Sequence, residues 1–243
     1  MAKYVISDIH GNFDMFIELI EKINFSESDE LYILGDVVDR EPHACKTLLW
    51  LMAHDNIFPI IGNHELMALP CLRFLIKEIS EENIKLIDDK MVKKLLIWQL
   101  NGGTATIGEF HKLTNEKQQA IIDYLGEFSA FEEVETGGNT YLLIHGGLDN
   151  YEPGKKIEDY TLQDIVWSRA DYDIRYFPDK FVVTGHTPTQ YIEDNPHPGY
   201  IFHKNGHIAI DCGCNKRNGR LAALCLDTGE EFYSSGNNES DLE

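Results

Sequence analysis

The sequence predicts an α/β fold, and three observations support this prediction. Short apolar runs typical of strands alternate with helical apolar spacing over the first third of the chain. Clusters of His, Asp, Asn and Gly follow five such runs, and a hairpin signal appears after residue 128. Alternating strands and helices indicate a parallel sheet with crossover helices. The length of 243 residues and the hydrophobic content of 43% suit one large domain.

The first expected strands are the apolar runs at 4–6, 31–34 and 57–61. Behind the first strand, apolar residues recur with helical spacing from Phe13 to Ile23. Pro42 is expected to open a second helix, because proline is favoured in the first turn. A third helical stretch follows His64, and residues 70–125 are expected to form a helical cap within the domain.

The pattern changes to strands from Phe128 onward. A hairpin is expected from residues 130–136 and 140–144, because Gly137-Gly138-Asn139 between them is a strong turn signal. Further strands are expected at 181–184, 207–211, 221–226 and 231–233. Residues 1–233 are therefore expected to form a single domain, and the polar residues 234–243 a disordered tail.

Composition excludes several classes of function. Lys and Arg number 21 against 41 Asp and Glu, and the resulting net charge of −20 repels nucleic acid. No apolar run approaches the roughly 18 residues of a membrane span, and the polar turn after Ile6 is not typical of a signal peptide. Five cysteines, an odd number, suggest reduced thiols. We therefore expect a cytoplasmic protein with no nucleic-acid or membrane partner.

The polar clusters at the strand ends predict a pair of metal ions. Asp8 and His10 lie two residues apart, and in an extended segment their side chains would point the same way. The two oxygens of Asp36 can bridge two ions. One ion is expected on Asp8, His10 and Asp36, and the other on Asp36, Asn63, His145 and His186. Mn, Fe and Zn are all compatible with these ligands, and Mn is the expected metal in vitro.

Each cluster alone is more often a turn or a helix cap, and only their order and common placement favour metal binding. Asp-x-His-Gly, Gly-Asp-x-Val-Asp-Arg, Gly-Asn-His-Glu and His-Gly-Gly resemble the signature blocks of one protein family. This is the phosphoprotein phosphatase branch of the calcineurin-like metallophosphoesterases, with small bacterial and phage members most similar. The resemblance extends from Tyr4 to about Glu231. It implies a four-layer fold, in which two mixed sheets pack together with helices outside.

The resemblance also implies roles for individual side chains. His64 would donate a proton to the leaving oxygen, and Asp39 would orient His64. Arg40 is suited to clamp a phosphate, because a guanidinium can bind two oxygens at once. Val166-Trp167-Ser168-Arg169 resembles a Trp-containing block of the family, so Arg169 is expected to be a second phosphate ligand. Glu41 departs from the family pattern, in which glycine usually follows the Asp-Arg pair.

These residues predict a metal-dependent phosphomonoesterase, most simply a bacterial protein phosphatase. Hydroxide held by the two metals would attack the phosphorus of phosphoserine, phosphothreonine or phosphotyrosine in line. The substrate would be a phosphorylated protein or peptide, or a small phosphorylated metabolite. Three alternatives stay open: a dinucleoside polyphosphate hydrolase such as a diadenosine tetraphosphatase, a cyclic-nucleotide phosphodiesterase, and a binding module for phosphorylated ligands. The catalytic residues alone do not separate these substrates, and the role of Cys212 and Cys214 is also open.

Overall fold

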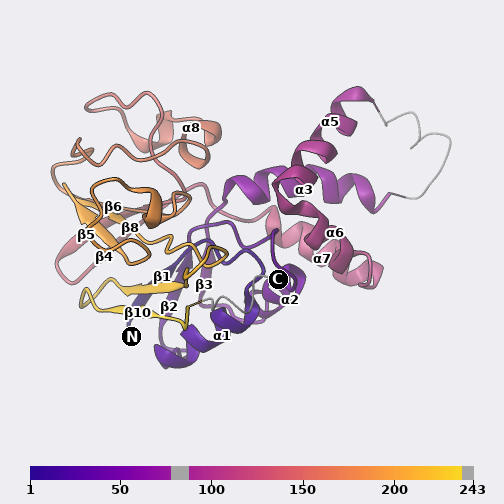
Figure 1. Cartoon of the computed structure of the whole chain (residues 1–243), viewed down its shortest axis with the longest axis horizontal. Helices are drawn as coiled ribbons and strands as arrows, with labels where there is room; N and C mark the ends of the chain where they lie inside the picture. Colours follow the sequence, from indigo (N-terminus) through magenta and orange to yellow (C-terminus); the bar gives the residue numbers. More distant parts are fainter. Residues whose placement is uncertain (78–87, 237–243) are drawn as a thin grey trace.

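In this computed structural model the protein has two five-stranded sheets. Figure 1 shows how the sheets and the helices are arranged. The structure describes residues 1–77 and 88–236. The first sheet has the order β10-β9-β1-β2-β3. Its strands are β1 (Lys3–Ile6), β2 (Glu30–Ile33), β3 (Ile57–Pro59), β9 (Ala222–Cys225) and β10 (Glu231–Tyr233). Strands β1, β2 and β3 run parallel, whereas β9 is antiparallel to both β1 and β10.

The second sheet repeats this mixed arrangement, with the order β4-β5-β6-β8-β7. Its strands are β4 (Glu132–Thr136), β5 (Asn139–Ile144), β6 (Phe181–Thr184), β7 (Phe202–Lys204) and β8 (His207–Ala209). The three inner strands β5, β6 and β8 are parallel, and the edge strands β4 and β7 are antiparallel. The sequence analysis did not predict β7, which has only three residues.

Alternating side chains divide the core into an inner and an outer layer. Val5 of β1 and Leu143 of β5 lie in the core between the sheets, together with Leu34 and Val183. Their chain neighbours Ile6 and Leu142 belong to the core on the helix side. Successive residues of a strand face opposite sides of a sheet, so both faces of each sheet are covered. This is the expected four-layer fold, with two mixed sheets and helices outside.

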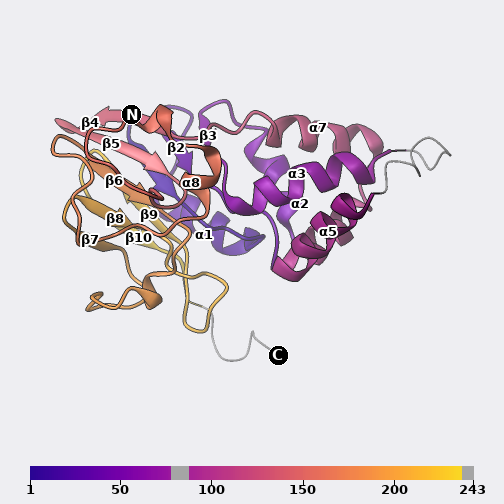
Figure 2. The ribbon, with the colours of Figure 1, turned by 90° about the horizontal axis from the view of Figure 1, so that it is seen from above.

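The helices occupy the ends and outer faces of the sandwich. Helices α3, α5 and α7 lie together beyond the sheets, on one side of both views (Figures 1 and 2). The helices are α1 (Phe13–Lys22), α2 (Ala44–Leu51), α3 (Asn63–Leu75), α5 (Asp89–Trp98), α6 (Thr104–Phe110), α7 (Asn115–Leu125) and α8 (Leu162–Val166), and a π-helical turn (Gln99–Gly103) joins α5 to α6. Among the described residues, no helix is long and apolar enough to span a lipid bilayer.

Three boundaries differ from the sequence prediction. Pro42 does not open α2: the helix starts at Ala44, because His43 before it has a left-handed backbone with φ 83°. The predicted start of the cap at residue 70 falls inside α3, which continues through Pro70 to Leu75. The first residue of the predicted disordered tail is packed against the domain. Ser234 is buried and its hydroxyl accepts the N–H of Leu221, while residues 237–243 lie outside the described part of the chain.

Candidate metal centre

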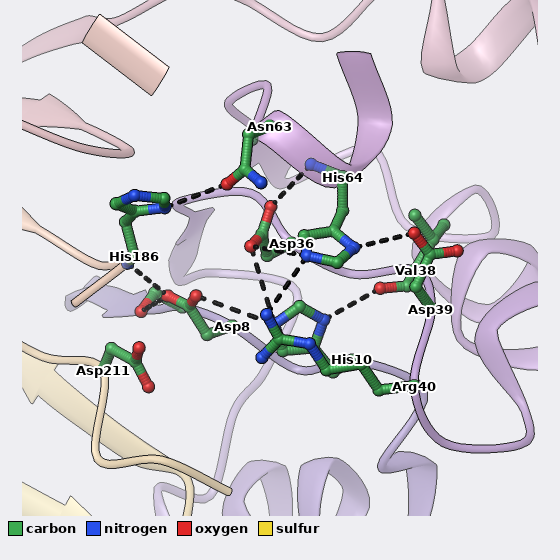
Figure 3. A network of polar contacts seen from close by, with 12 residues as sticks. Asp8, His10, Asp36, Val38, Asp39, Arg40, Asn63, His64, His186 and Asp211 are labelled. Atoms are coloured by element: carbon green, nitrogen blue, oxygen red, sulfur yellow. Dashed lines mark hydrogen bonds and ion pairs between the residues drawn. The ribbon is translucent and has the colours of Figure 1, made fainter. Parts of the chain in front are cut away.

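The five polar clusters meet where the parallel strands of the two sheets end. The loops after β1 and β2 run side by side, because the N–H of His10 donates to the oxygen of Asp36 at 2.8 Å. The second sheet contributes the loops after β5 and β6, and the N–H of Gly185 donates to the oxygen of His145 at 2.9 Å. Figure 3 shows the resulting group of side chains. The ends of these strands thus bring together residues that are up to 178 positions apart in the sequence.

Two groups of potential metal ligands share the carboxylate of Asp36. In each group, the ligand atoms all lie within 4.8 Å of one another. One group is His10, Asp36 and His64, and the other is Asp36, His145 and His186. Oδ2 of Asp36 lies 3.5 Å from Nε2 of His10, whereas Oδ1 lies 3.4 Å from Nε2 of His145. Each oxygen thus faces a different group, as a bridging carboxylate requires.

His10 provides a first test of whether a cation fits. Its Nδ1 lies 2.9 Å from the backbone oxygen of Val38, so this nitrogen carries the proton and donates it. Nε2 is then left with a lone pair, and this buried atom has no hydrogen-bond partner among the residues that the structure describes. It faces carboxylate oxygens of Asp36 at 3.5 Å and Asp8 at 3.9 Å. An imidazole lone pair beside two carboxylates fits a divalent cation, and the backbone bond fixes the required tautomer.

The second group gives the same result. Nδ1 of His145 donates to the oxygen of Leu34 at 2.6 Å, so its Nε2 also presents a lone pair. That lone pair points toward Oδ1 of Asn63 at 2.9 Å, and Nδ1 of His186 lies 2.9 Å from the same oxygen. Nε2 of His145 and Oδ1 of Asn63 are then both acceptors, so this close approach requires a cation or a proton between them. The residues therefore fit a second metal, with Asn63 as a neutral oxygen ligand.

Burial shifts the ionisation of these groups in opposite directions. Burial raises the pKa of Asp8 to about 6, and nearby Asp36 adds to the increase. Burial also lowers the pKa of His186 to about 3, and it lowers the pKa values of His10 and His145. The histidines are therefore held as neutral imidazoles, the form that coordinates metals. Burial likewise raises the pKa of Asp36 despite the nearby charges of His64 and Arg40, so further positive charge from metal ions would stabilise the ionised carboxylates.

Glu65 fixes the loop that carries Asp36. Its carboxylate is fully buried and accepts the backbone N–H groups of Asp36 (2.7 Å), Val37 (2.8 Å), Val38 (3.2 Å) and Gly62 (3.0 Å). From the sequence, Glu65 was recognised only as the last residue of the Gly-Asn-His-Glu block. Its additional role is to hold the loops after β2 and β3 together. This role could not be predicted from the sequence, because it depends on how the backbones of the two loops are placed in the fold.

The predicted His64–Asp39 pair is present in the structure. Nδ1 of His64 lies 2.7 Å from Oδ2 of Asp39, and both side chains are buried. Burial lowers the pKa of His64, but the charges of Asp36 and Asp39 outweigh burial, so this pKa is raised overall. Nη2 of Arg40 lies 3.2 Å from Nε2 of His64. Because a guanidinium can only donate, Nε2 is the acceptor in this contact.

Arg169 lies at the rim of the centre, apart from the other predicted residues. It lines a cavity with Thr187, the residue after His186, and a second one with Trp167. The charge of Arg169 contributes to the lowered pKa of His186, which places the two side chains within electrostatic range. Asp211 is a carboxylate that the sequence analysis did not assign to the site. It is buried, and burial and Asp8 raise its pKa well above its ordinary value.

Comparison with known proteins adds the family to this geometry. A family model described as calcineurin-like phosphoesterase matches residues 1–213. The chain belongs to this family. It is therefore a metal-dependent phosphoesterase, and its His and Asp clusters correspond to a metal-binding site. The predicted membership in the calcineurin-like metallophosphoesterases is confirmed.

Individual relatives differ in the substrates that their names state. Serine/threonine-protein phosphatase 2 of Salmonella typhimurium is 27% identical over 96% of this chain and 89% of its own length. A symmetrical bis(5'-nucleosyl)-tetraphosphatase of Delftia acidovorans is 37% identical, over 74% of this chain and 60% of its own. A solved protein serine/threonine phosphatase from Saccharomyces cerevisiae has a TM-score of 0.60 at 14% identity, covering 98% of this chain and 80% of its own. This last similarity shows the fold alone.

Replacing Glu65 with Gln is predicted to weaken both the fold and the metal centre. One carboxylate oxygen becomes an NH₂ group that faces backbone donors, so the free energy of unfolding should fall by about 1–3 kcal/mol. Urea unfolding measures this loss, and elemental analysis of protein equilibrated with Mn²⁺ measures the bound metal.

Glu109→Gln is the matched control, because Glu109 also accepts two backbone N–H groups, those of Cys45 and Lys46. This control should lose stability but keep its metal. Wild-type stability and full metal content in Glu65→Gln would contradict the role of Glu65.

Proposed function

We propose that this protein is a phosphomonoesterase that hydrolyses phosphorylated proteins or peptides. The charge around Arg169 is the observation that favours a phosphopeptide over a polyphosphate substrate. The cavity that Arg169 lines contains four acidic residues, namely Asp171, Asp173, Glu193 and Asp194. Lys204, the other cation there, is already paired with Asp173 and Asp194. Such a rim repels a long polyphosphate chain and suits one phosphate on a peptide with basic neighbours.

The proposed chemistry depends on side chains with distinct tasks. Two divalent ions on the ligand set would activate water as the nucleophile and offset charge on the phosphate oxygens. The ligands would be Asp8, His10, Asp36, Asn63, His145 and His186. Arg40 and Arg169 would bind phosphate oxygens through their guanidinium groups and so orient the ester for in-line displacement.

His64 would protonate the leaving oxygen through Nε2. Asp39 accepts a hydrogen bond from Nδ1–H of His64. The opposite ring nitrogen, Nε2, therefore points away from Asp39 and lies 3.9 Å from Oδ2 of Asp36. In the structure Arg40 donates to Nε2, so a proton can occupy this nitrogen only after the guanidinium turns to another acceptor. A substrate phosphate is such an acceptor. Phosphate binding by Arg40 would therefore prepare His64 to act as the general acid.

Hydrolysis of dinucleoside polyphosphates is the second candidate. It is supported by the 37% identity to a symmetrical bis(5'-nucleosyl)-tetraphosphatase. The similarity to the Salmonella typhimurium phosphatase extends over more of both chains and supports the first candidate. The two candidates share the metal centre and differ in the surface around it. Only a comparison of substrates distinguishes them.

A side-by-side rate comparison tests the substrate class. With added Mn²⁺, phosphoserine, phosphothreonine and phosphotyrosine peptides with basic flanking residues should be hydrolysed faster than diadenosine tetraphosphate. Peptides of the same sequence with acidic flanks serve as the matched control, and their kcat/KM should be lower. If the dinucleotide exceeds every peptide by orders of magnitude, the proposed substrate class is wrong.

His64→Asn tests whether the site is catalytic. Because general acid catalysis contributes about 10²–10⁴-fold, kcat on a phosphopeptide should fall by that order with little change in KM. His111→Asn is the control, since His111 is exposed at the end of α6. Unchanged hydrolysis in His64→Asn would exclude the acid role. Binding of phosphopeptide by a wild-type protein that never turns it over would favour the binding module instead.

A further inference from the structure

The end of α5 and the turn that follows it lie directly against the Asp39–Arg40 loop, and Trp98, the last residue of α5, contacts Asp39. Its side chain is fully buried. Its Nε1–H donates to both carboxylate oxygens of Asp39, at 2.8 Å to Oδ2 and 3.0 Å to Oδ1. Oδ2 also accepts the hydrogen bond from Nδ1–H of His64, at 2.7 Å. Trp98 and His64 therefore converge on one atom of the proposed catalytic pair.

Thr106 holds Asp39 from a second direction. Its buried hydroxyl donates to Oδ1 of Asp39 at 2.7 Å and accepts the backbone N–H of the same residue at 2.9 Å. One hydroxyl thus fixes both the side chain and the backbone of Asp39. With His64, Trp98 and Thr106 in place, both oxygens of this buried carboxylate receive donors, which satisfies a group that is costly to bury.

The backbone of the same turn supports a strained loop. Asp39 and Arg40 have positive φ angles of 74° and 72°, which non-glycine residues seldom adopt. The N–H of Arg40 donates to the oxygen of Gly102 at 3.1 Å. Gly102 itself has φ 102°, and a Cβ there would lie 2.9 Å from the backbone nitrogen of Arg40. The turn therefore fits closely around the loop that carries Asp39.

We infer that Trp98 and Thr106 are positioning residues that hold Asp39 so that His64 can deliver a proton to the leaving group. This inference rests on the proposed function. A carboxylate fixed at both oxygens cannot rotate, so the imidazole keeps the orientation that points Nε2 toward the reacting centre. Without these donors, the carboxylate would turn and water would compete for its oxygens. The cost would appear in proton delivery and not in phosphate binding.

Two aryl phosphates separate proton delivery from every other step. p-Nitrophenolate leaves without a proton, whereas phenolate is a poorer leaving group and depends on the acid. In Mn²⁺-loaded protein, Trp98→Phe and Thr106→Val should each lower kcat on phenyl phosphate roughly tenfold or more, within the range of general acid catalysis. The kcat on p-nitrophenyl phosphate should change less than about threefold, and KM should be unchanged for both substrates.

Matched controls lie in helix α2. Trp50→Phe alters a tryptophan that packs edge-on against Phe16, and Thr47→Val removes a buried hydroxyl that donates to the oxygen of His43. Both should retain wild-type rates on both aryl phosphates. Thr106→Ser keeps the hydroxyl and should restore the rate on phenyl phosphate. Thermal unfolding of each variant shows which ones are folded, and Thr106→Val remains decisive if Trp98→Phe does not fold.

Asp39→Asn separates failure of the inference from failure of the proposed function. The inference is overturned if Asp39→Asn slows phenyl phosphate selectively while Trp98→Phe and Thr106→Val behave like their controls. It is also overturned if those two variants slow both substrates equally. If Asp39→Asn has no selective effect, or if the wild type hydrolyses neither aryl phosphate, the proposed function fails first.

Discussion

The shared carboxylate of Asp36 is the interaction on which the centre depends. It is buried with Asp8, and the lone pairs of His10 and His145 face its two oxygens. Such a cluster without a counter-charge costs several kcal/mol per buried ion. Divalent cations remove this cost, because each one turns repelling lone pairs into ligands. The metals would thus contribute to stability as well as to the chemistry.

The loops around this carboxylate keep a conformation that they would not adopt alone. Asp8, Asp36 and Asp39 all have positive φ angles, a conformation that costs on the order of 1–3 kcal/mol for each residue. Glu65 offsets the cost at the loop after β2 through its bonds to three consecutive backbone N–H groups. Strain at these three aspartates is balanced by buried partners, and this balance holds their side chains in place.

The sequence was sufficient to bring the expected ligands together, because these residues follow strands. A parallel strand delivers the residue after its end to a known edge of the sheet, so Asp8, Asp36 and Asn63 could be placed together without coordinates. Trp98 and Thr106 could not be placed, since their contacts with Asp39 span 59 and 67 residues and depend on how a helical turn packs. The prediction that Pro42 opens α2 was wrong for a local reason, because the left-handed backbone of His43 separates Pro42 from the helix. Most strands of the second sheet were predicted from the residue pattern, but only the family resemblance indicated that they form a separate sheet.

Anomalous diffraction from crystals grown with Mn²⁺ tests the central claim most directly. Two manganese peaks should appear, one beside Nε2 of His10 and one beside Nε2 of His145, with the carboxylate of Asp36 bound to both. The same crystals should show the oxygen of Asn63 on the second ion only. A single peak, or two peaks of which only one contacts Asp36, would contradict the bridging role on which this account of the fold and the chemistry depends.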